Sequence, residues 1–340
     1  MSHPPTLNKR LILVVLLSLL GHATAADTSA EECELADPTL YLWDAKQLSN
    51  LKKKYQSGDA SSVFKSSLSF LERECAEALD GETYSVTYQK RVPESGDIHD
   101  YQSVGYYWWP CAEAEHEGFN NCVQKTKTGT EPKECVDDAK WGSIPWRYCD
   151  GHHNAATFEY SSKESMQQMT NQVRDLALLW YYTEKDQYAR IASQLLQVFF
   201  LDEDTRMNPM LQYAQFVPDL WYFESAGLIE ITGWTELLEA VAILRTSQHW
   251  SNAHHRQLMD WMYELMEWLQ TSRMGEKEHY AGNNHAVWYY QTVIGMGLHV
   301  TEIFSFHGYP AMTHERLSDN THTRAHLFVC CAERKLGFSS

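Results

Sequence analysis

Apolar residues recur every three or four positions along much of the chain, which is the spacing of one face of a helix. Met166, Met169 and Val173 begin one such stripe, and it continues to Trp180. Further stripes of the same kind follow it, and a weaker one precedes it. The pattern predicts helices over residues 45–55, 166–180, 188–199, 237–244, 254–271 and 285–303.

Alternation of apolar and polar residues, which is typical of strands, is almost absent. The predicted helices follow one another as pairs joined by short or aromatic loops, an order that suits antiparallel packing. Residues 84–162 differ, since they hold four cysteines and most of the turn-forming residues. The cysteines and aromatic residues favour an ordered loop region over a linker. We therefore expect an all-α solenoid or toroid with a cysteine- and aromatic-rich loop region.

The N-terminus has the layout of a secretory signal peptide. Lys9 and Arg10 precede an apolar run over residues 11–20, and the small residues Ala23 and Ala25 follow it. The run is about half as long as a bilayer crossing requires. We expect cleavage near Ala25 or its neighbour, no membrane attachment afterwards, and an extracellular location, or a periplasmic one in a bacterium. The expected organisation is a signal peptide over 1–25, a helical domain over 26–310 and an atypical tail over 311–340.

Composition narrows the set of partners. The formal net charge is −17, which excludes nucleic acid as a partner and disfavours any polyanion unless the basic residues gather locally. Twelve Trp and 19 Tyr supply more rings than a core usually needs, so some are available for stacking on sugars. Of the eight cysteines, the first six in the chain suit disulfides in an oxidising compartment, but nothing selects one pairing. No C-x-x-C pair is present, so a metal site is not expected.

Three segments concentrate polar and aromatic groups. Residues 103–110 include Tyr107 and Trp108, whose rings suit either a sugar ring or a core cluster. Residues 205–215 would suit a uronate or a capped turn between helices. Residues 282–291 hold an imidazole beside amides, which suits proton transfer or an ordinary helix cap. The candidate residues of the last two segments are Arg206, Asn208, Tyr213, Gln215, Asn283, Asn284, His285 and Trp288.

In this order, the three segments resemble motifs of the alginate lyase superfamily, and the resemblance spans residues 101–299. It implies an (α/α) toroid or incomplete barrel of antiparallel helix pairs that cleaves alginate or a related polyuronate by β-elimination without a cofactor. It also implies that Asn284 and His285 are catalytic: together they neutralise the C6 carboxylate and remove the C5 proton. The remaining candidate residues would bind the acidic polysaccharide.

Similar enzymes place an arginine and a catalytic tyrosine well downstream of the Asn-His pair. After Ile303 only Tyr309 remains, without the surrounding pattern. We therefore expect a C-terminally truncated chain, or another tyrosine, Tyr107 or Tyr213, as the acid. Two alternatives stay open: a lyase relative that binds acidic polysaccharide without cleaving it, and a glycoside hydrolase. A hydrolase would need two carboxylates, and candidates such as Glu230 sit in no motif.

Overall fold

The computed structural model describes residues 38–90, 92–110, 122–123, 137–138, 142–143, 146–149, 151–154, 157, 162–217 and 225–306. Residues 36–303 form one compact unit. The expected signal peptide over 1–25, the tail over 311–340 and Tyr309 lie outside the described residues. None of the described helices is long and apolar enough to cross a bilayer.

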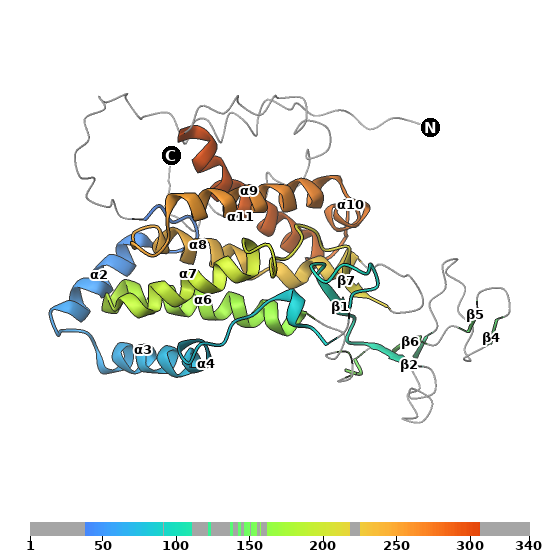
Figure 1. Ribbon diagram of the computed structural model, residues 1–340, viewed down its shortest axis with the longest axis horizontal. Coiled ribbons are helices and arrows are strands. Elements are labelled where there is room, and N and C mark those ends of the chain that lie inside the picture. The colour runs from blue at the N-terminus through green and yellow to red at the C-terminus, as the bar shows by residue number, and fades with distance from the viewer. Residues whose placement is uncertain are drawn as a thin grey trace. The chain divides into compact units, whose positions relative to one another are not determined.

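Helix α6, Lys163–Thr183, is the central element of this unit. It packs against α7, Asp186–Phe200, against α8, Trp234–Leu244, and against two N-terminal helices (Figure 1). Met169, Val173 and Leu176 are fully buried on it, as their spacing predicted. Glu184 ends α6 in the left-handed conformation (φ 57°), so α7 starts two residues later and runs back along α6.

The N-terminal helices are amphipathic and capped. Helix α2, Ala45–Gln56, begins after Asp44, and α3, Ser62–Glu74, begins after Ser61; each cap side chain accepts a backbone N–H of the first turn. A short helix α4, Ala76–Leu79, and the 3₁₀ turn η1, Val86–Tyr88, follow. Both α2 and α3 pack against α6.

The C-terminal helices begin at capped positions. They are α9, Asn252–Thr271, α10, Arg273–His279, and α11, Asn284–Phe306. Ser251 and Ser272 cap α9 and α10. Rings of α7, α8 and α9 meet in the core, because the centroid of Phe200 lies 5.4 Å from that of Trp234 and 4.7 Å from that of Trp261. These contacts bind the predicted helices into one apolar core.

A buried carboxylate ties the start of the described chain to this core. Glu239 of α8 accepts the backbone N–H of Tyr41 at 2.9 Å and that of Trp43 at 3.0 Å. His299 of α11 lies 3.0 Å from the same carboxylate. Burial opposes ionisation, but these hydrogen bonds outweigh it and lower the pKa of Glu239. The carboxylate therefore holds three segments together.

Short strands complete the unit. β1, Gln102–Val104, pairs in parallel with β7, Tyr213–Phe216. β6, Trp146–Cys149, lies between β2, Trp108–Pro110, and β3, Cys122–Val123, while β4, Asp137–Asp138, pairs with β5, Gly142–Ser143. The mostly helical prediction is confirmed, but the sequence did not indicate these sheets, because strands this short cannot show alternation.

Two features of the prediction remain open. Closure of the helices into a toroid or incomplete barrel stays a prediction. Cys75 is a free, buried thiol and Cys149 is disulfide-bonded, while the pairing expected among the first six cysteines also stays a prediction. The expectation of a disulfide is therefore wrong for Cys75, which is a free thiol buried in the fold.

Candidate active site

The first two sequence motifs lie side by side, because β1 carries one and β7 carries the other. Gln102 is in register with Tyr213, and the backbone N–H of Gln215 donates to Ser103 Oγ at 2.8 Å. The 3₁₀ turn η3, Ser225–Ile231, packs against β7. Segments more than a hundred residues apart in sequence thus form one scaffold.

Glu230 of η3 is the centre of this scaffold. Its carboxylate, 1% exposed, accepts hydrogen bonds from Tyr101 Oη at 2.6 Å and from Ser103 Oγ at 2.7 Å. The ammonium group of Lys163, at the start of α6, lies 3.3 Å away. Burial, with Glu230 close by, raises the pKa of Tyr101 well above its ordinary value, so its hydroxyl stays protonated and continues to donate. The network fixes β1, η3 and α6 to one another.

Backbone geometry at the scaffold admits few substitutions. Gln215 has φ 49°, a left-handed conformation that costs a non-glycine residue free energy and is commonest at functional sites. A Cβ at Gly227 would lie 2.5 Å from the Ala214 backbone, so η3 reaches β7 only because this residue is glycine. The motif glycine Gly105 is similarly confined by the ring of Trp108, at 2.7 Å.

The third motif supplies a paired imidazole. His285 lies in the first turn of α11, and its Nδ1 is 3.0 Å from Glu278 Oε2 on α10. Glu278 is buried, whereas the His285 side chain is 23% exposed. A carboxylate oxygen accepts hydrogen bonds, so in the neutral ring Glu278 favours the tautomer with the proton on Nδ1, in which the lone pair of Nε2 is available. This arrangement suits a partly exposed base.

The neighbouring amides differ in their roles. Asn283 Oδ1 accepts the backbone N–H of His285 at 3.0 Å, so Asn283 caps α11 as its alternative interpretation predicted. Asn284, the first residue of α11, is exposed, and the structure gives its amide no hydrogen bond within the described chain. Trp288, one turn later, is 36% exposed. His285, Asn284 and Trp288 therefore present polar and aromatic groups to the surface.

The third motif reaches the first two through η3, since η3 packs against α10 as well as β7. Figure 1 shows β1, β7 and α10 in the same part of the unit. Within the described residues, no hydrogen bond or ion pair joins His285 directly to the first two motifs. The 3₁₀ turn η3 thus contacts both β7 and α10, and α10 carries the Glu278 carboxylate that pairs with His285.

Aromatic residues of the first motif divide into a core residue and surface residues. Trp108 is 1% exposed and packs with Trp146 and Val217, so its ring is not an open stacking surface. Tyr107 is partly exposed and its ring lies edge-on to His153, with centroids 5.2 Å apart. The ring of Tyr106 stacks on His153 and carries the Lys163 ammonium group 4.2 Å from its centroid.

The second motif is tied into the fold. The Asn208 amide donates to Asp100 at 2.7 Å and to Asp97 at 3.0 Å, while Arg206 is exposed on the turn after α7. A cavity of about 480 Å³ beside Asn208 is also lined by Glu264 and Glu267 of α9. These carboxylates make the cavity unsuitable for a uronate. Binding of substrate by Asn208 and Arg206 stays a prediction.

The sequence offered Glu230 only as a candidate carboxylate of a hydrolase, and it did not reveal Glu278, Lys163 or His153, because none of the four belongs to a recognised motif. Only the seven-residue separation of Glu278 and His285 could have indicated their pairing, and it needs the turn between α10 and α11 to be known. Among the described residues, no group of three or more His, Cys, Asp or Glu side chains is placed to hold a metal ion.

The three motifs lie in a region that is similar to known proteins. A protein-family model described as alginate lyase matches residues 85–303 of this chain, and these residues include all three motifs. The structure is similar to the crystal structure of an alginate lyase from Bacteroides ovatus, with a TM-score of 0.64 and 27% sequence identity. The match covers 77% of this chain and 62% of that chain, so this chain spans less than two thirds of that protein's length. No curated protein matches the sequence.

Proposed function

Since the chain belongs to the alginate lyase family, we propose that it is a secreted polysaccharide lyase that cleaves alginate or a glucuronan-like polyuronate by β-elimination. The observation that carries this proposal is the pairing of His285 with Glu278 beside an exposed amide. The family supplies the reaction type, and the pairing supplies a residue that can perform its first step.

The chemistry can be assigned to individual groups. Amide donation from Asn284, with the guanidinium of Arg206, neutralises the C6 carboxylate and so acidifies the C5 proton. Nε2 of His285 then takes that proton. The electron pair left on C5 forms the C4=C5 double bond, the C4–O4 bond breaks, and an acid protonates the departing O4.

Two tyrosines are candidates for that acid. Tyr107 is partly exposed beside His153, and Tyr213 lies on β7, where burial and Asp100 raise its pKa above the ordinary value. The raised pKa keeps the Tyr213 phenol protonated at neutral pH, so it can donate. Replacing each with phenylalanine should identify the acid, since only the catalytic hydroxyl is needed for turnover.

Subsite roles follow from exposure. Tyr107, Gln215 and Trp288 are partly exposed or exposed and would contact sugar rings and hydroxyls, with Tyr213 doing so if it is not the acid. Asn283 and Trp108 would act by holding the motif backbone, because one caps α11 and the other is buried. A hydrolase is less well supported, since Glu230 is buried and already has three partners.

The direct test is to incubate the mature protein with alginate and, separately, with glucuronan, and to follow the ultraviolet absorbance of unsaturated ends. We expect absorbance to rise with at least one polymer and to disappear with His285→Ala. Affinity without product would indicate the binding-only alternative. New reducing ends without the double bond would indicate hydrolysis, and either result would refute the proposal.

A further inference from the structure

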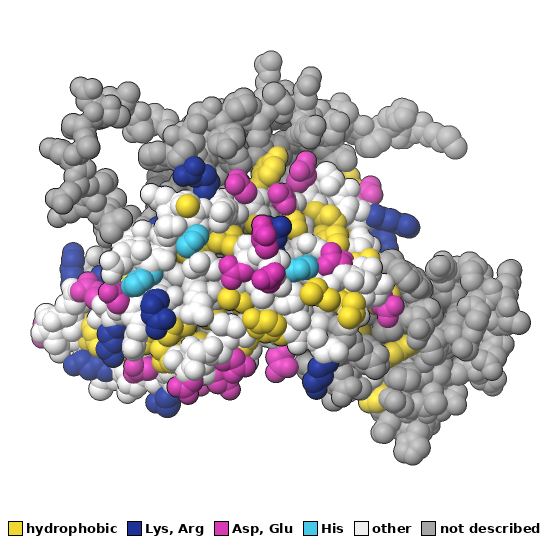
Figure 2. Space-filling model, viewed as in Figure 1, with side chains coloured by type: hydrophobic (Ala, Val, Ile, Leu, Met, Phe, Trp, Pro, Cys, Tyr) yellow, Lys and Arg dark blue, Asp and Glu magenta, His cyan; other side chains and the backbone are white. Residues whose placement is uncertain are grey.

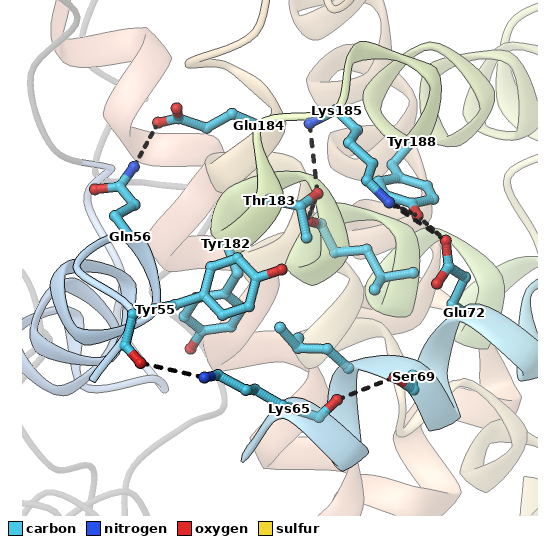
Figure 3. A pocket seen from close by; sticks show the side chains of 13 residues that line it. Tyr55, Gln56, Lys65, Ser69, Glu72, Tyr182, Thr183, Glu184, Lys185 and Tyr188 are labelled. Atoms are coloured by element: carbon cyan, nitrogen blue, oxygen red, sulfur yellow. Dashed lines mark hydrogen bonds and ion pairs between the residues drawn. The ribbon is translucent and has the colours of Figure 1, made fainter. Parts of the chain in front are cut away.

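A second cavity, of about 560 Å³, lies where α2, α3 and the α6–α7 turn meet (Figure 3). Its volume is within the range of small-molecule sites. It is lined by residues of α2 and α3 together with Tyr182, Thr183 and Tyr188. None of the three sequence motifs contributes to it.

The cavity is remote from the candidate active site. Lys163 at one end of α6 pairs with Glu230, and Thr183 at the other end lines the cavity. The helix has 21 residues. At 1.5 Å per residue the two sites are therefore separated by about 30 Å along α6.

The lining combines rings, hydroxyls and ammonium groups. Tyr55 of α2 is partly exposed and supplies the accessible ring, whereas Tyr182 and Tyr188 are buried within the wall. Ser69 and Lys65 of α3 are exposed at the edge of the cavity (Figure 3). Apolar ring surface beside hydroxyl and ammonium donors is the combination that recognises a sugar bearing a carboxylate.

Both carboxylates that line the cavity already have partners. Glu72 accepts a short hydrogen bond from the Tyr188 hydroxyl, which lowers its pKa, and Lys185 lies 3.6 Å away. Glu184 pairs with Lys52 at 2.9 Å and with Gln56 at 3.1 Å. The negative charges are therefore compensated within the wall.

Lys65 is different. Its ammonium group donates to the backbone carbonyl of Gly58 at 3.2 Å, and among the described residues no carboxylate lies within ion-pair distance of it. Helix α2 adds four lysines and no acidic residue. Figure 2 shows dark-blue and magenta side chains intermixed over the part of this face formed by α2 and α3. Among the described residues, Lys65 is therefore a cation without an acidic partner beside a cavity whose other charged groups are paired.

We propose that this cavity is a non-catalytic binding site for a segment of acidic polysaccharide. The substrate class rests on the proposed function, but the site itself rests on the cavity, its rings and Lys65. A polymer long enough to reach both sites would bind more tightly than a short oligomer, because the second contact becomes intramolecular. The active site would then act on chains that this cavity holds.

The variants are matched in pairs. Ser69→Trp fills the cavity, and Ser67→Trp places the same ring on the opposite side of α3, about 200° around the helix. Both serines are exposed and make the same hydrogen bond to the carbonyl four residues earlier. Lys65→Glu reverses the charge at the cavity. Arg256→Glu makes the same change at an exposed position of α9, away from the cavity.

The test is migration of the full-length chain through native gels that contain alginate, glucuronan or neutral dextran, each compared with a gel without polymer. We expect an acidic polymer, and not dextran, to retard the wild type. Ser69→Trp should lose this retardation and Lys65→Glu should bind roughly fivefold more weakly, as expected for loss of one surface ion pair. Ser67→Trp, Arg256→Glu and His285→Ala should keep it.

Equal retardation of Ser69→Trp and Ser67→Trp would overturn the proposal, and so would loss of all retardation with His285→Ala, no retardation of the wild type, or equal retardation by dextran. Unfolding temperatures identify a variant that fails to fold, and Lys65→Glu then carries the test without filling the cavity. Formation of unsaturated ends is measured separately. A chain that is retarded but yields no product would refute the proposed function and leave this binding site standing.

Discussion

Replacing Glu278 with glutamine should slow β-elimination without unfolding the protein. In the native chain the buried carboxylate lies 3.0 Å from Nδ1 of His285, and its oxygen can only accept a hydrogen bond from the ring N–H. A glutamine amide can also donate, so the ring can place its proton on Nε2, where it blocks the base. The substitution thus disturbs the tautomer while keeping the shape of the side chain.

The expected size follows from the type of bond. A hydrogen bond to a charged group contributes about 1.5–3 kcal/mol. Losing about 2 kcal/mol of transition-state stabilisation corresponds to a fall in kcat of roughly 30-fold. KM should change little, because Glu278 is buried and does not reach the substrate.

Glu276→Gln is the matched control, since Glu276 lies on the same short helix, is exposed and has no contact with His285. Rates of unsaturated-end formation with alginate or glucuronan should separate the two variants. The ¹⁵N NMR shifts of the His285 ring report the tautomer independently of turnover. Equal rates and equal ring shifts for the two variants would refute the role assigned to Glu278.

Three further predictions concern the scaffold and its stability. Gly227→Ala should lower the free energy of unfolding by about 1–3 kcal/mol, because its Cβ would lie 2.5 Å from the Ala214 backbone, whereas Gly282→Ala, with no atom within 4 Å, should be near neutral. Glu230→Gln should lower it by about 1–3 kcal/mol, since it removes the charge of a buried carboxylate that accepts hydrogen bonds from Tyr101 and Ser103 and lies beside Lys163; an unchanged urea midpoint would contradict this. Burial lowers the pKa of His255 to about 3, so the unfolded chain takes up this proton near pH 6.5 and the folded chain does not. The contribution of His255 to the free energy of unfolding is therefore fully present above pH 6.5 and is lost as the pH falls towards 3; at pH 5 it is about 2 kcal/mol smaller than at pH 7. In urea unfolding, His255→Gln should lack this pH-dependent loss.

The sequence predicted the long helices well, because each buries one apolar face over several turns. The stripe from Met166 to Trp180 lies within α6, and the stripe over residues 254–271 lies within α9. Short elements gave no such signal. Helix α10 has seven residues, too few for a periodic face, and β1 has three.

The site was predicted as motifs but not as an assembly. Motif spacing along the chain identified His285 and Gln215, but it could not show that η3 lies between them. Glu230 and Glu278 act through buried contacts with partners that the fold brings together. Such residues leave no local pattern, because their partners are defined by tertiary packing.

Net charge was the weakest guide to the partner, for a physical reason. At physiological ionic strength, exposed charges more than about 8 Å apart are largely screened, so the local groups decide what binds. The formal net charge of −17 is a total over surfaces of opposite sign, which include the cavity lined by Glu264 and Glu267 and the lysine-rich helix α2. A polyanion is repelled at the first and attracted at the second. The proposed binding of an acidic chain at the Thr183 end of α6 is therefore compatible with the negative net charge of the protein.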